Sequence, residues 1–432
     1  MLKKSMMQEC HQARQHRVRS TESCERRVSQ ATTNWFPHHL ELLDDPTTKK
    51  LRLSCCKVDK AVVRSVARSI QDNTVLEDLW LDGNLIDIDV ALNLACSLKT
   101  NKTLRILRLR GSKLTGTGGA AIFNALKESE GVQELYLEGN DIGVHAAAAL
   151  GIMIRQNKSL RVLHVRQNPI GAEGLAHITD ALQFNRTIQE LCLQQNNLES
   201  HVSESLGAML VVNRTLKMLY IVYNRVTTPD LADLCKYMEC NHTLEQFILT
   251  GNVIELEGAE ALGRMLAKTK SLQKFCLWGN ELGSEGALAI INGLLANNNN
   301  TSLREFRMVS NQVGDEAAKR MAELLLVNES LTEVDLTSNR ITDDGAKPLA
   351  AALETNVTCR ALGIQGNPRV SDTVKKELNY NLSLNKAGRQ FLKHGKLIPW
   401  GLWATILGSI SKKPDMIFYL LREKPDLVTS SM

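Results

Sequence analysis

The 432-residue chain is poor in aromatic side chains, in proline and in cysteine. Phe, Trp and Tyr make up only 4% of the residues, so a large core has to be built from aliphatic side chains. Ten cysteines in a chain of this length, without a CxxC pair, exclude a small disulfide-stapled scaffold and favour reduced thiols in an intracellular protein. The 43% hydrophobic and 23% charged residues are otherwise typical of a globular protein.

Runs that could span a membrane or direct secretion are also missing. The most apolar late stretch, residues 397–410, contains Pro399 and Gly401 and is shorter than the roughly 20 residues that a bilayer requires. The basic residues at the N-terminus are not followed by an apolar segment, which excludes a signal peptide. A mitochondrial presequence is the alternative, although three glutamates in this segment disfavour it. We therefore expect a cytoplasmic or nuclear protein without a membrane span.

Positive charge is not spread along the chain. Residues 1–30 contain seven Lys or Arg against three acids, and residues 379–432 contain eight against three. Because the net charge of the whole chain is +5, the long middle part is slightly acidic. A nucleic-acid-binding surface on that middle part is therefore not expected.

Signatures of catalysis and of metal binding are absent as well. The sequence contains no GxxxxGK(S/T), HExxH or GxSxG motif. Cys10, His11, His16 and Cys24 lie close together, but their spacing fits no common zinc site. We therefore predict a protein that is not an enzyme and that holds no cofactor and no metal.

What the sequence does contain is a repeated pattern, LxxLxLxxN, in which Val, Ile, Phe or Met sometimes replaces Leu. It reads LEDLWLDGN at 76–84, VQELYLEGN at 132–140 and LQKFCLWGN at 272–280. The closing position recurs every 28 residues, with one step of 31 whose extra residues we place in the polar run 297–300. The closing residues are Cys56, Asn84, Ser112, Asn140, Asn168, Asn196, Asn224, Asn252, Asn280, Asn311, Asn339 and Asn367. Such periodicity is typical of a repeat protein.

Each repeat predicts one strand and one helix. The LxLxx part alternates with period two, so the leucines face a core and the residues between them face solvent. A segment with helical spacing of apolar and small residues follows, for example at 258–272. One such unit cannot bury its apolar face alone, so neighbouring units have to stack into a solenoid. Strands are about 4.8 Å apart and helices about 10 Å wide, so we expect the stack to bend, with the strands inside.

The repeats at 48–378 resemble the ribonuclease-inhibitor-like class of leucine-rich repeats. The resemblance implies an α/β horseshoe of about 12 repeats, with a parallel sheet on the concave side and helices outside. This class includes ribonuclease inhibitor, the Ran GTPase-activating protein and the recognition domains of NOD-like receptors. Ribonuclease inhibitor alternates Asn and Cys at the closing position, whereas Asn dominates here. The repeat type is therefore closer to the Ran-activator and NOD-receptor branches.

Asparagine at the closing position is predicted to be structural. Its amide has both donors and acceptors, so it can bridge main-chain groups of adjacent turns. We predict this ladder at Asn84, Asn140, Asn168, Asn196, Asn224, Asn252, Asn280, Asn311, Asn339 and Asn367. Ser112 and Cys56 interrupt it, and we expect locally weaker structure there. The N-x-S/T sequons at Asn101, Asn185, Asn213 and Asn241 follow from the repeat at its helix-to-strand turn, so glycosylation is not expected.

The two ends of the chain depart from the repeat. Residues 1–33 are basic and poor in apolar residues and are predicted to be disordered, and residues 34–47 are predicted to be an N-terminal cap. Residues 379–432 are predicted to be a helical C-terminal cap or, alternatively, a docking segment, because aromatic and basic residues are concentrated there.

Candidate binding residues lie at the solvent-facing positions of the strands. Aromatic and arginine side chains are enriched in binding hot spots, and equivalent positions of adjacent repeats lie side by side. The central row places Trp80, Arg108, Tyr136 and His164 in one candidate patch, and Tyr220, Tyr223 and Trp278 form a second. Arg110 and Arg166 belong to a neighbouring row that alternates in sign with Asp82 and Glu138. Both rows could also be ordinary cross-strand neighbours that stack or neutralise one another.

Together these features predict a scaffold that binds a protein partner on its concave face. They leave the oligomeric state open and favour a monomer. The alternative is a GTPase-activating protein resembling the Ran activator, with a small GTPase as partner. Such a protein orients the catalytic groups of the GTPase and needs no catalytic motif of its own. The acidic tail typical of that family is missing, because the longest acidic runs are pairs such as Asp44-Asp45. A sensor in innate-type recognition is a third interpretation, and it rests on fold analogy alone.

Overall fold

The computed structural model describes residues 43, 45–54, 60–198, 202–296, 301–386 and 389. The predicted disordered segment 1–33, most of the predicted cap 34–47, Cys56 and the polar run 297–300 lie outside the described residues. So does most of the predicted C-terminal segment 379–432, of which residues 379–386 and Arg389 are described.

Strands and helices alternate through the described part of the chain. The strands are β1 (Lys50–Arg52), β2 (Asp78–Trp80), β3 (Ile106–Arg108), β4 (Glu134–Tyr136), β5 (Val162–His164), β6 (Glu190–Cys192), β7 (Met218–Tyr220), β8 (Gln246–Ile248), β9 (Lys274–Cys276), β10 (Glu305–Arg307), β11 (Glu333–Asp335) and β12 (Ala361–Gly363). From β1 to β6 and from β8 to β12, strands of consecutive repeats pair with one another in parallel. The predicted α/β leucine-rich repeat solenoid of about 12 repeats is thereby confirmed.

One helix follows each strand among the described residues. The helices are α3 (Lys60–Ser69), α4 (Ile88–Thr100), α5 (Gly116–Leu126), α6 (Val144–Gln156), α7 (Gly171–Leu182), α8 (Val202–Val212), α9 (Thr228–Met238), α10 (Leu256–Lys268), α11 (Gly283–Ala296), α12 (Asp315–Val327), α13 (Asp343–Thr355) and α14 (Asp372–Lys386). In α4, α5 and α9 the side chain of Asp87, Thr115 or Thr227 accepts a main-chain N–H bond and caps the start of the helix.

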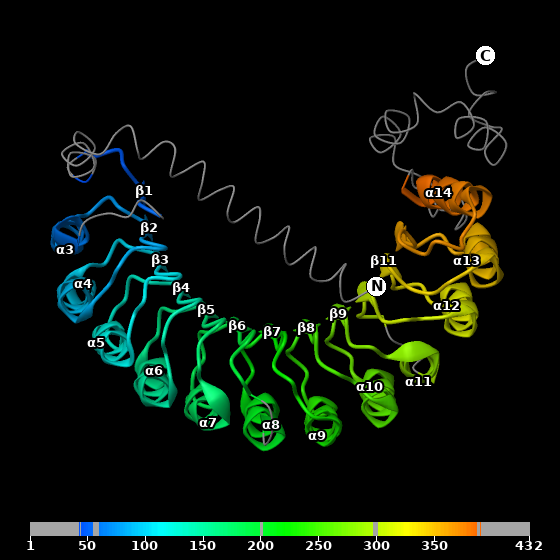
Figure 1. Ribbon diagram of the computed structural model, residues 1–432, viewed down its shortest axis with the longest axis horizontal. Helices are drawn as coiled ribbons and strands as arrows, with labels where there is room; N and C mark the ends of the chain where they lie inside the picture. The colour runs from blue at the N-terminus through cyan, green and yellow to red at the C-terminus, as the bar shows by residue number, and fades with distance from the viewer. Residues whose placement is uncertain are drawn as a thin grey trace, which may run out of the picture. The chain divides into compact units, whose positions relative to one another are not determined.

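The chain divides into two compact units, which are unit 1 (Met1–Leu219) and unit 2 (Tyr220–Met432). Within each unit the described helices cover one face of the strands, and none of them lies on the other face (Figure 1). In unit 1 each strand residue pairs with the residue 28 positions later, as Leu79 does with Leu107. In unit 2 Phe275 pairs with Phe306, so the step of 31 residues keeps the strand register despite the longer repeat.

The middle residue of each strand triplet forms the core between the strands and the helices. Leu79, Leu107 and Leu135 have no exposed surface, and in unit 2 Phe247, Phe275 and Phe306 are equally buried and stack on one another. Small residues bring the helices close together. A side chain on Gly263 would come within 2.5 Å of the carbonyl oxygen of Ala289 on the next helix. In the described triplets other than β2 and β6, the residues on either side of the buried centre are half-buried or exposed, whereas Asp78 and Cys192 are buried. This pattern positions the candidate site.

Candidate protein-binding site

The central row of unit 1 lies in register on the open face of the strands. Arg52 pairs with Trp80, Trp80 with Arg108, Arg108 with Tyr136, and Tyr136 with His164. Arg52 is exposed and the other four side chains are half-buried. The structure therefore brings the predicted first patch together on the face that the helices do not cover.

Arginine and aromatic side chains alternate along this row as one stack. The guanidinium carbon of Arg52 lies 4.0 Å from the centre of the Trp80 ring, and that of Arg108 lies 4.2 Å from the same ring. Arg108 is also 4.3 Å from the centre of the Tyr136 ring. The Tyr136 ring meets the His164 ring edge-on, with 4.8 Å between their centres. We name these five residues, Arg52, Trp80, Arg108, Tyr136 and His164, the Arg–aromatic stack.

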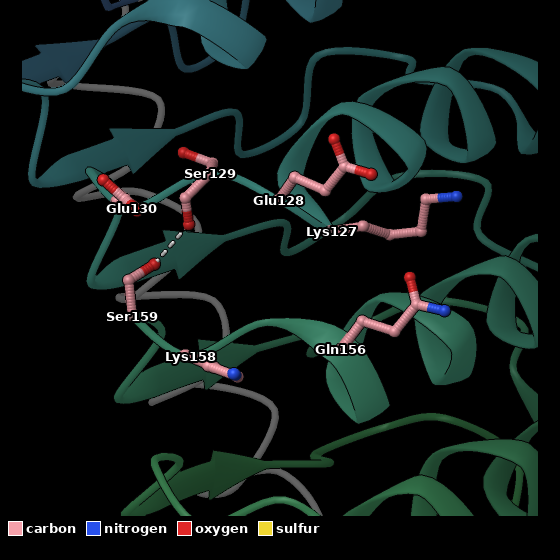
Figure 2. A pocket seen from close by; sticks show the side chains of 7 residues that line it. All are labelled: Lys127, Glu128, Ser129, Glu130, Gln156, Lys158 and Ser159. Carbon is pink, nitrogen blue, oxygen red and sulfur yellow. Dashed lines mark hydrogen bonds between the residues drawn. The ribbon is translucent and has the colours of Figure 1, made fainter.

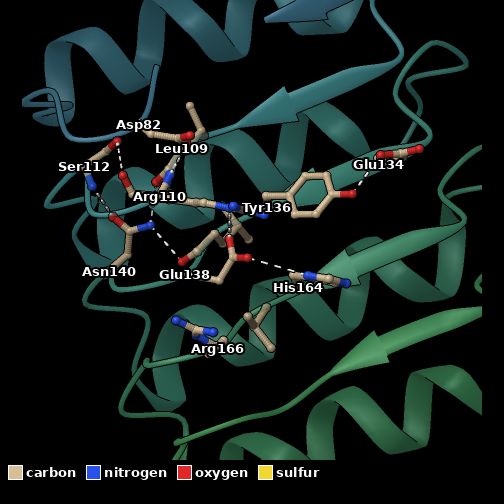
Figure 3. A network of polar contacts seen from close by, with 12 residues as sticks. Asp82, Leu109, Arg110, Ser112, Glu134, Tyr136, Glu138, Asn140, His164 and Arg166 are labelled. Atoms are coloured by element: carbon tan, nitrogen blue, oxygen red, sulfur yellow. Dashed lines mark hydrogen bonds and ion pairs between the residues drawn. The ribbon is translucent and has the colours of Figure 1, made fainter. Parts of the chain in front are cut away.

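Glu138 connects the stack to the neighbouring charged row (Figure 3). Its carboxylate accepts a bond of 2.9 Å from Nε of Arg110, and the Nδ1 atom of His164 lies 3.5 Å away. The Nε2 atom of His164 lies 2.9 Å from Glu190, so the ring is held between two carboxylates. The guanidinium of Arg110 lies 4.7 Å from the centre of the Tyr136 ring. These contacts fix the orientation of the His164 ring and of the Tyr136 ring at the centre of the patch.

This arrangement changes the pKa values of the groups involved. Burial lowers the pKa of His164, but the hydrogen bonds and charges of Glu138 and Glu190 outweigh it and raise the pKa above 6.5. Burial likewise opposes the ionised form of Glu138, yet His164 and Arg110 bring its pKa below the usual value. Burial and the hydrogen bond to Glu134 raise the pKa of Tyr136, so its hydroxyl stays protonated and donates to Glu134 over 2.8 Å.

The alternating charges of the neighbouring row are only partly neutralised. Arg110 pairs with Glu138, whereas Asp82 accepts the main-chain N–H of Arg110 over 2.8 Å. Burial raises the pKa of Asp82. Arg166 is exposed, and its Nη1 donates to Gln194 over 3.5 Å rather than to a carboxylate. Of the predicted alternating charges, Arg110 and Glu138 form an ion pair, whereas Arg166 stays accessible.

The cysteine next to the Arg–aromatic stack has a thiol that rarely ionises. Cys192 follows His164 in the register and is buried. Burial raises the pKa of its thiol to about 11, so the thiolate form is scarce at neutral pH. Among the described residues, no group of His, Cys, Asp and Glu is arranged to hold a metal ion.

The second predicted patch lies in unit 2 around the turn at Gly251. Tyr220 is half-buried, while Tyr223 and Trp278 have 39% and 44% of their surface exposed. A side chain at Gly251 would come within 2.1 Å of the Tyr223 ring, so this ring lies directly on the glycine. The N–H of Gly251 donates to the carbonyl of Trp278 over 2.8 Å. Glycine is required there for two reasons, the left-handed φ of +67° and the ring above it.

Two shallow polar pockets lie at the helix-to-strand turns of unit 1, not on the strand triplets. One has a volume of about 320 Å³ and is lined by Lys127, Glu128, Ser129, Glu130, Gln156, Lys158 and Ser159 (Figure 2). The other has about 350 Å³ and adds Gln133, Arg161, Arg186, Thr187 and Gln189 to Glu130, Lys158 and Ser159. Neither pocket includes a residue of the Arg–aromatic stack.

Comparison with known proteins agrees with the repeat architecture. The family model described as leucine-rich repeat matches residues 100–123, 156–178, 240–263, 299–322 and 327–350. The chain contains leucine-rich repeats. A search of curated proteins finds no match.

Three solved structures are similar to this chain at low sequence identity and with TM-scores below 0.5. A chain in the crystal structure of the Rad7 and Elc1 complex in yeast is 15% identical, with a TM-score of 0.42, over 87% of this chain and 95% of that chain. Actin-binding site 2 of leiomodin-1 is 16% identical, with a TM-score of 0.27, over 48% of this chain and 90% of that chain. The tropomodulin C-terminal domain from Caenorhabditis elegans is 18% identical, with a TM-score of 0.30, over 40% of this chain and 100% of that chain.

The asparagines that close the leucine-rich repeats are all buried and bonded to main chain. Asn140 is representative, because its Nδ2 donates to the carbonyls of Leu109 and Leu137, both at 2.8 Å. Its Oδ1 accepts the N–H groups of Ser112 and Leu114 at 3.1 and 3.0 Å. Ser112 supplies one donor in this position, from Oγ to the carbonyl of Leu81 at 3.1 Å or to that of Arg110 at 3.3 Å.

A second asparagine ladder, which the sequence reasoning missed, lies at the helix-to-strand turns. Asn213 follows α8, and its Nδ2 donates to the carbonyls of Leu182 and Asn185 at 2.7 and 3.3 Å. Its Oδ1 accepts the N–H groups of Thr215 and Leu216 at 2.8 and 2.7 Å. Equivalent buried asparagines are Asn101, Asn157, Asn185, Asn241 and Asn356. The regular recurrence of the N-x-S/T sequons was the signal that could have revealed this ladder.

No helix in the described ranges is long and apolar enough to cross a membrane.

Proposed function

We propose that the protein is a non-enzymatic scaffold that binds a protein partner on the strand face of unit 1. The observation that supports this proposal is the Arg–aromatic stack, which places two aromatic rings and two arginines on the face that the helices leave open. Aromatic and arginine side chains contribute most to binding when a partner covers them. Because the stack and the ion pair Arg110–Glu138 already hold these side chains, binding would require little further ordering.

The second patch of unit 2, around Tyr223 and Trp278, is proposed as a further contact surface. Both rings are accessible, and the glycine turn between them leaves no side chain that would cover them. Exposed aromatic side chains on a rigid turn offer contact area at a low cost in conformational entropy.

Affinity purification with variants of unit 1 tests the proposal. The double variant Trp80→Ala/Tyr136→Ala should lose the specific partners that copurify with the wild type, because truncating a hot spot costs at least about 2 kcal/mol. A matched control is Phe184→Ala, because Phe184 is also an exposed ring with an arginine 4.1 Å from its centre but follows helix α7. Retention of every partner by the double variant would contradict the proposed site, and deletion of residues 379–432 would then be the next trial.

Activation of a small GTPase is the competing function. It is suggested by the repeat type, and no contact described above favours it. We expect the protein to leave GTP hydrolysis by Ran at its intrinsic rate. Acceleration by several orders of magnitude, measured as phosphate release from GTP-loaded Ran, would replace the scaffold with a GTPase activator.

A further inference from the structure

The guanidinium of Arg108 lies against two aromatic rings, one on each neighbouring strand. The centres of the Trp80 and Tyr136 rings lie 4.2 and 4.3 Å from its guanidinium carbon. Aromatic rings interact with the faces of a guanidinium and leave its N–H groups, which lie in its plane, available for hydrogen bonds. The stack therefore fixes the direction in which Arg108 can donate.

Those donors have no partner within the described ranges. No hydrogen bond or ion pair is formed by the Arg108 guanidinium there, and its Nε is buried without an acceptor. One acid on each flanking strand is engaged elsewhere. Asp78 bonds to Lys50 and to Nε1 of Trp80, and Glu134 accepts the hydroxyl of Tyr136. The terminal Nη groups are not among the buried atoms without a partner, so an acceptor from outside the chain can reach them and satisfy these donors.

Arg307 of unit 2 occupies the same position in its repeat, and its Nε is likewise buried without an acceptor, but its terminal nitrogens differ from those of Arg108. Its Nη2 lies 3.1 Å from Glu305 on its own strand and 2.7 Å from Glu333 on the next strand. Where Glu305 stands in that repeat, the repeat of Arg108 has Ile106. The same position of the repeat thus carries a neutralised arginine in unit 2 and, among the described residues, an arginine without a carboxylate in unit 1.

We propose that Arg108 receives an acidic side chain of the protein partner, whose carboxylate binds the in-plane N–H groups of the guanidinium. The inference rests on the proposed function, because it names the partner chemistry for the same face. Arg52 adds a second cation at 4.0 Å from Trp80, and it forms no ion pair with a carboxylate among the described residues. The acids Asp82, Glu134 and Glu138 nearby disfavour a polyanion such as nucleic acid, whereas one carboxylate matches one guanidinium.

A peptide selection tests this inference while the partner is still unidentified. Displayed random 12-residue peptides would be selected on the full chain, and enriched sequences would be synthesised with a fluorophore for anisotropy titration. We expect the enriched peptides to share an Asp or Glu. Replacing that residue with Asn or Gln should weaken binding at least about tenfold, since a charge-assisted bond is lost.

Variants of the protein complete the test. Arg108→Gln and Arg108→Lys should both lower the affinity for the acidic peptides. Glutamine removes the charge, and lysine keeps the charge but lacks the planar donors and the stacking. Arg307→Gln is the matched control and should leave the affinity unchanged. Circular dichroism and the thermal midpoint establish that each variant is folded, and the peptide substitutions need no protein variant at all.

Several results would overturn the inference. The selection could enrich no peptide, or it could enrich peptides that share no acidic residue. Phosphopeptides could bind where their acidic counterparts do not. Arg108→Gln and Arg307→Gln could lower the peptide affinity equally. Peptides whose binding depends on Trp80 and Tyr136 but not on Arg108 would contradict this inference and leave the proposed function intact. Peptides that bind the Trp80→Ala/Tyr136→Ala variant as tightly as the wild type would contradict the proposed function as well.

Discussion

Single side chains in this protein act through contacts with the preceding or the following repeat. His164 is held between Glu138 of one strand and Glu190 of the next, and its raised pKa reflects these two carboxylates. Asn280 likewise joins three repeats, because its Nδ2 donates to Leu249 at 2.7 Å and its own N–H donates to Oδ1 of Asn311 at 2.9 Å. Substitution of either residue therefore affects more than one strand.

For His164 we predict a pH-dependent contribution to stability. The raised pKa means that the contribution is fully present below pH 6.5 and is lost as the pH rises through the higher value of the folded state. His164→Gln should therefore lower the free energy of unfolding more at pH 5.5 than at pH 8.5. Urea titrations at both values measure this difference, and His145→Gln on the exposed surface of α6 is the control. An equal deficit at the two pH values would contradict the prediction.

For Asn280 we predict a loss of stability upon substitution by alanine. The change removes the donor to Leu249 and the acceptor that receives the N–H of Asn252 at 2.8 Å. Each main-chain group left buried without a partner costs about 1–3 kcal/mol. The urea midpoint of Asn280→Ala should fall accordingly, whereas Asn292→Ala on the exposed face of α11 should change it little.

At the level of the elements, a buried asparagine joins the end of each of several helices to the strand that follows. The Oδ1 atom of Asn213 accepts two main-chain N–H groups of the residues that follow it. Its Nδ2 donates to the carbonyls of Leu182 and Asn185 at the helix-to-strand turn of the preceding repeat. Its exposed fraction is only 1%, so an attached glycan could not be accommodated in the folded protein. The sequons recur with the repeat because each asparagine forms these hydrogen bonds at its own helix-to-strand turn.

We predict that Asn213→Asp is destabilising although it keeps the acceptor. The new carboxylate oxygen would face two carbonyl oxygens in a buried position, and the protein would lose both donors. The expected loss is at least about 1–3 kcal/mol, because a buried group is left without a partner and a charge is added. Asn292→Asp is the control, because its Oδ1 already accepts from Arg320 at the surface. Differential scanning fluorimetry with urea titration distinguishes the two.

At the level of the molecule, the main contacts between described helices join helices of consecutive repeats. Stability in such an array is approximately a sum of repeat and interface contributions. In unit 2 Phe247, Phe275 and Phe306 stack with 5.8 and 6.2 Å between ring centres. The Phe275 ring therefore contacts the repeat before and the repeat after its own. A cavity at this residue should weaken those repeats first.

Phe275→Ala should lower stability by about 3–5 kcal/mol, as large-to-small changes of buried aromatic residues do. Hydrogen exchange followed by mass spectrometry should show the largest loss of protection in β8, β9 and β10 and unchanged protection in β2 to β4. Uniform loss of protection over the described strands would show that the repeats unfold as one cooperative unit. Phe184→Ala, at an exposed ring, is the control.

The binding roles assigned to Trp80, Arg108, Arg110, Tyr136, His164, Arg166, Tyr220, Tyr223 and Trp278 remain predictions. The sequence indicated which of their positions face solvent, since alternation in a strand decides that locally. It did not indicate that Arg307 is neutralised while Arg108 is not, although both stand at the same position of their repeats. That difference depends on Glu305 of the same strand, where β3 has Ile106, and on the Tyr136 hydroxyl, which donates to Glu134 on the strand after Arg108.

The 28-residue spacing by itself determined the order of strands and helices, the parallel register and the buried residue of each triplet. These properties follow from period and polarity, which each repeat carries within its own sequence. Only the tertiary structure decided which donor meets which acceptor across the strands, as with Glu138 between Arg110 and His164. A long side chain can reach several neighbours, and the choice among them depends on the packing of all of them together.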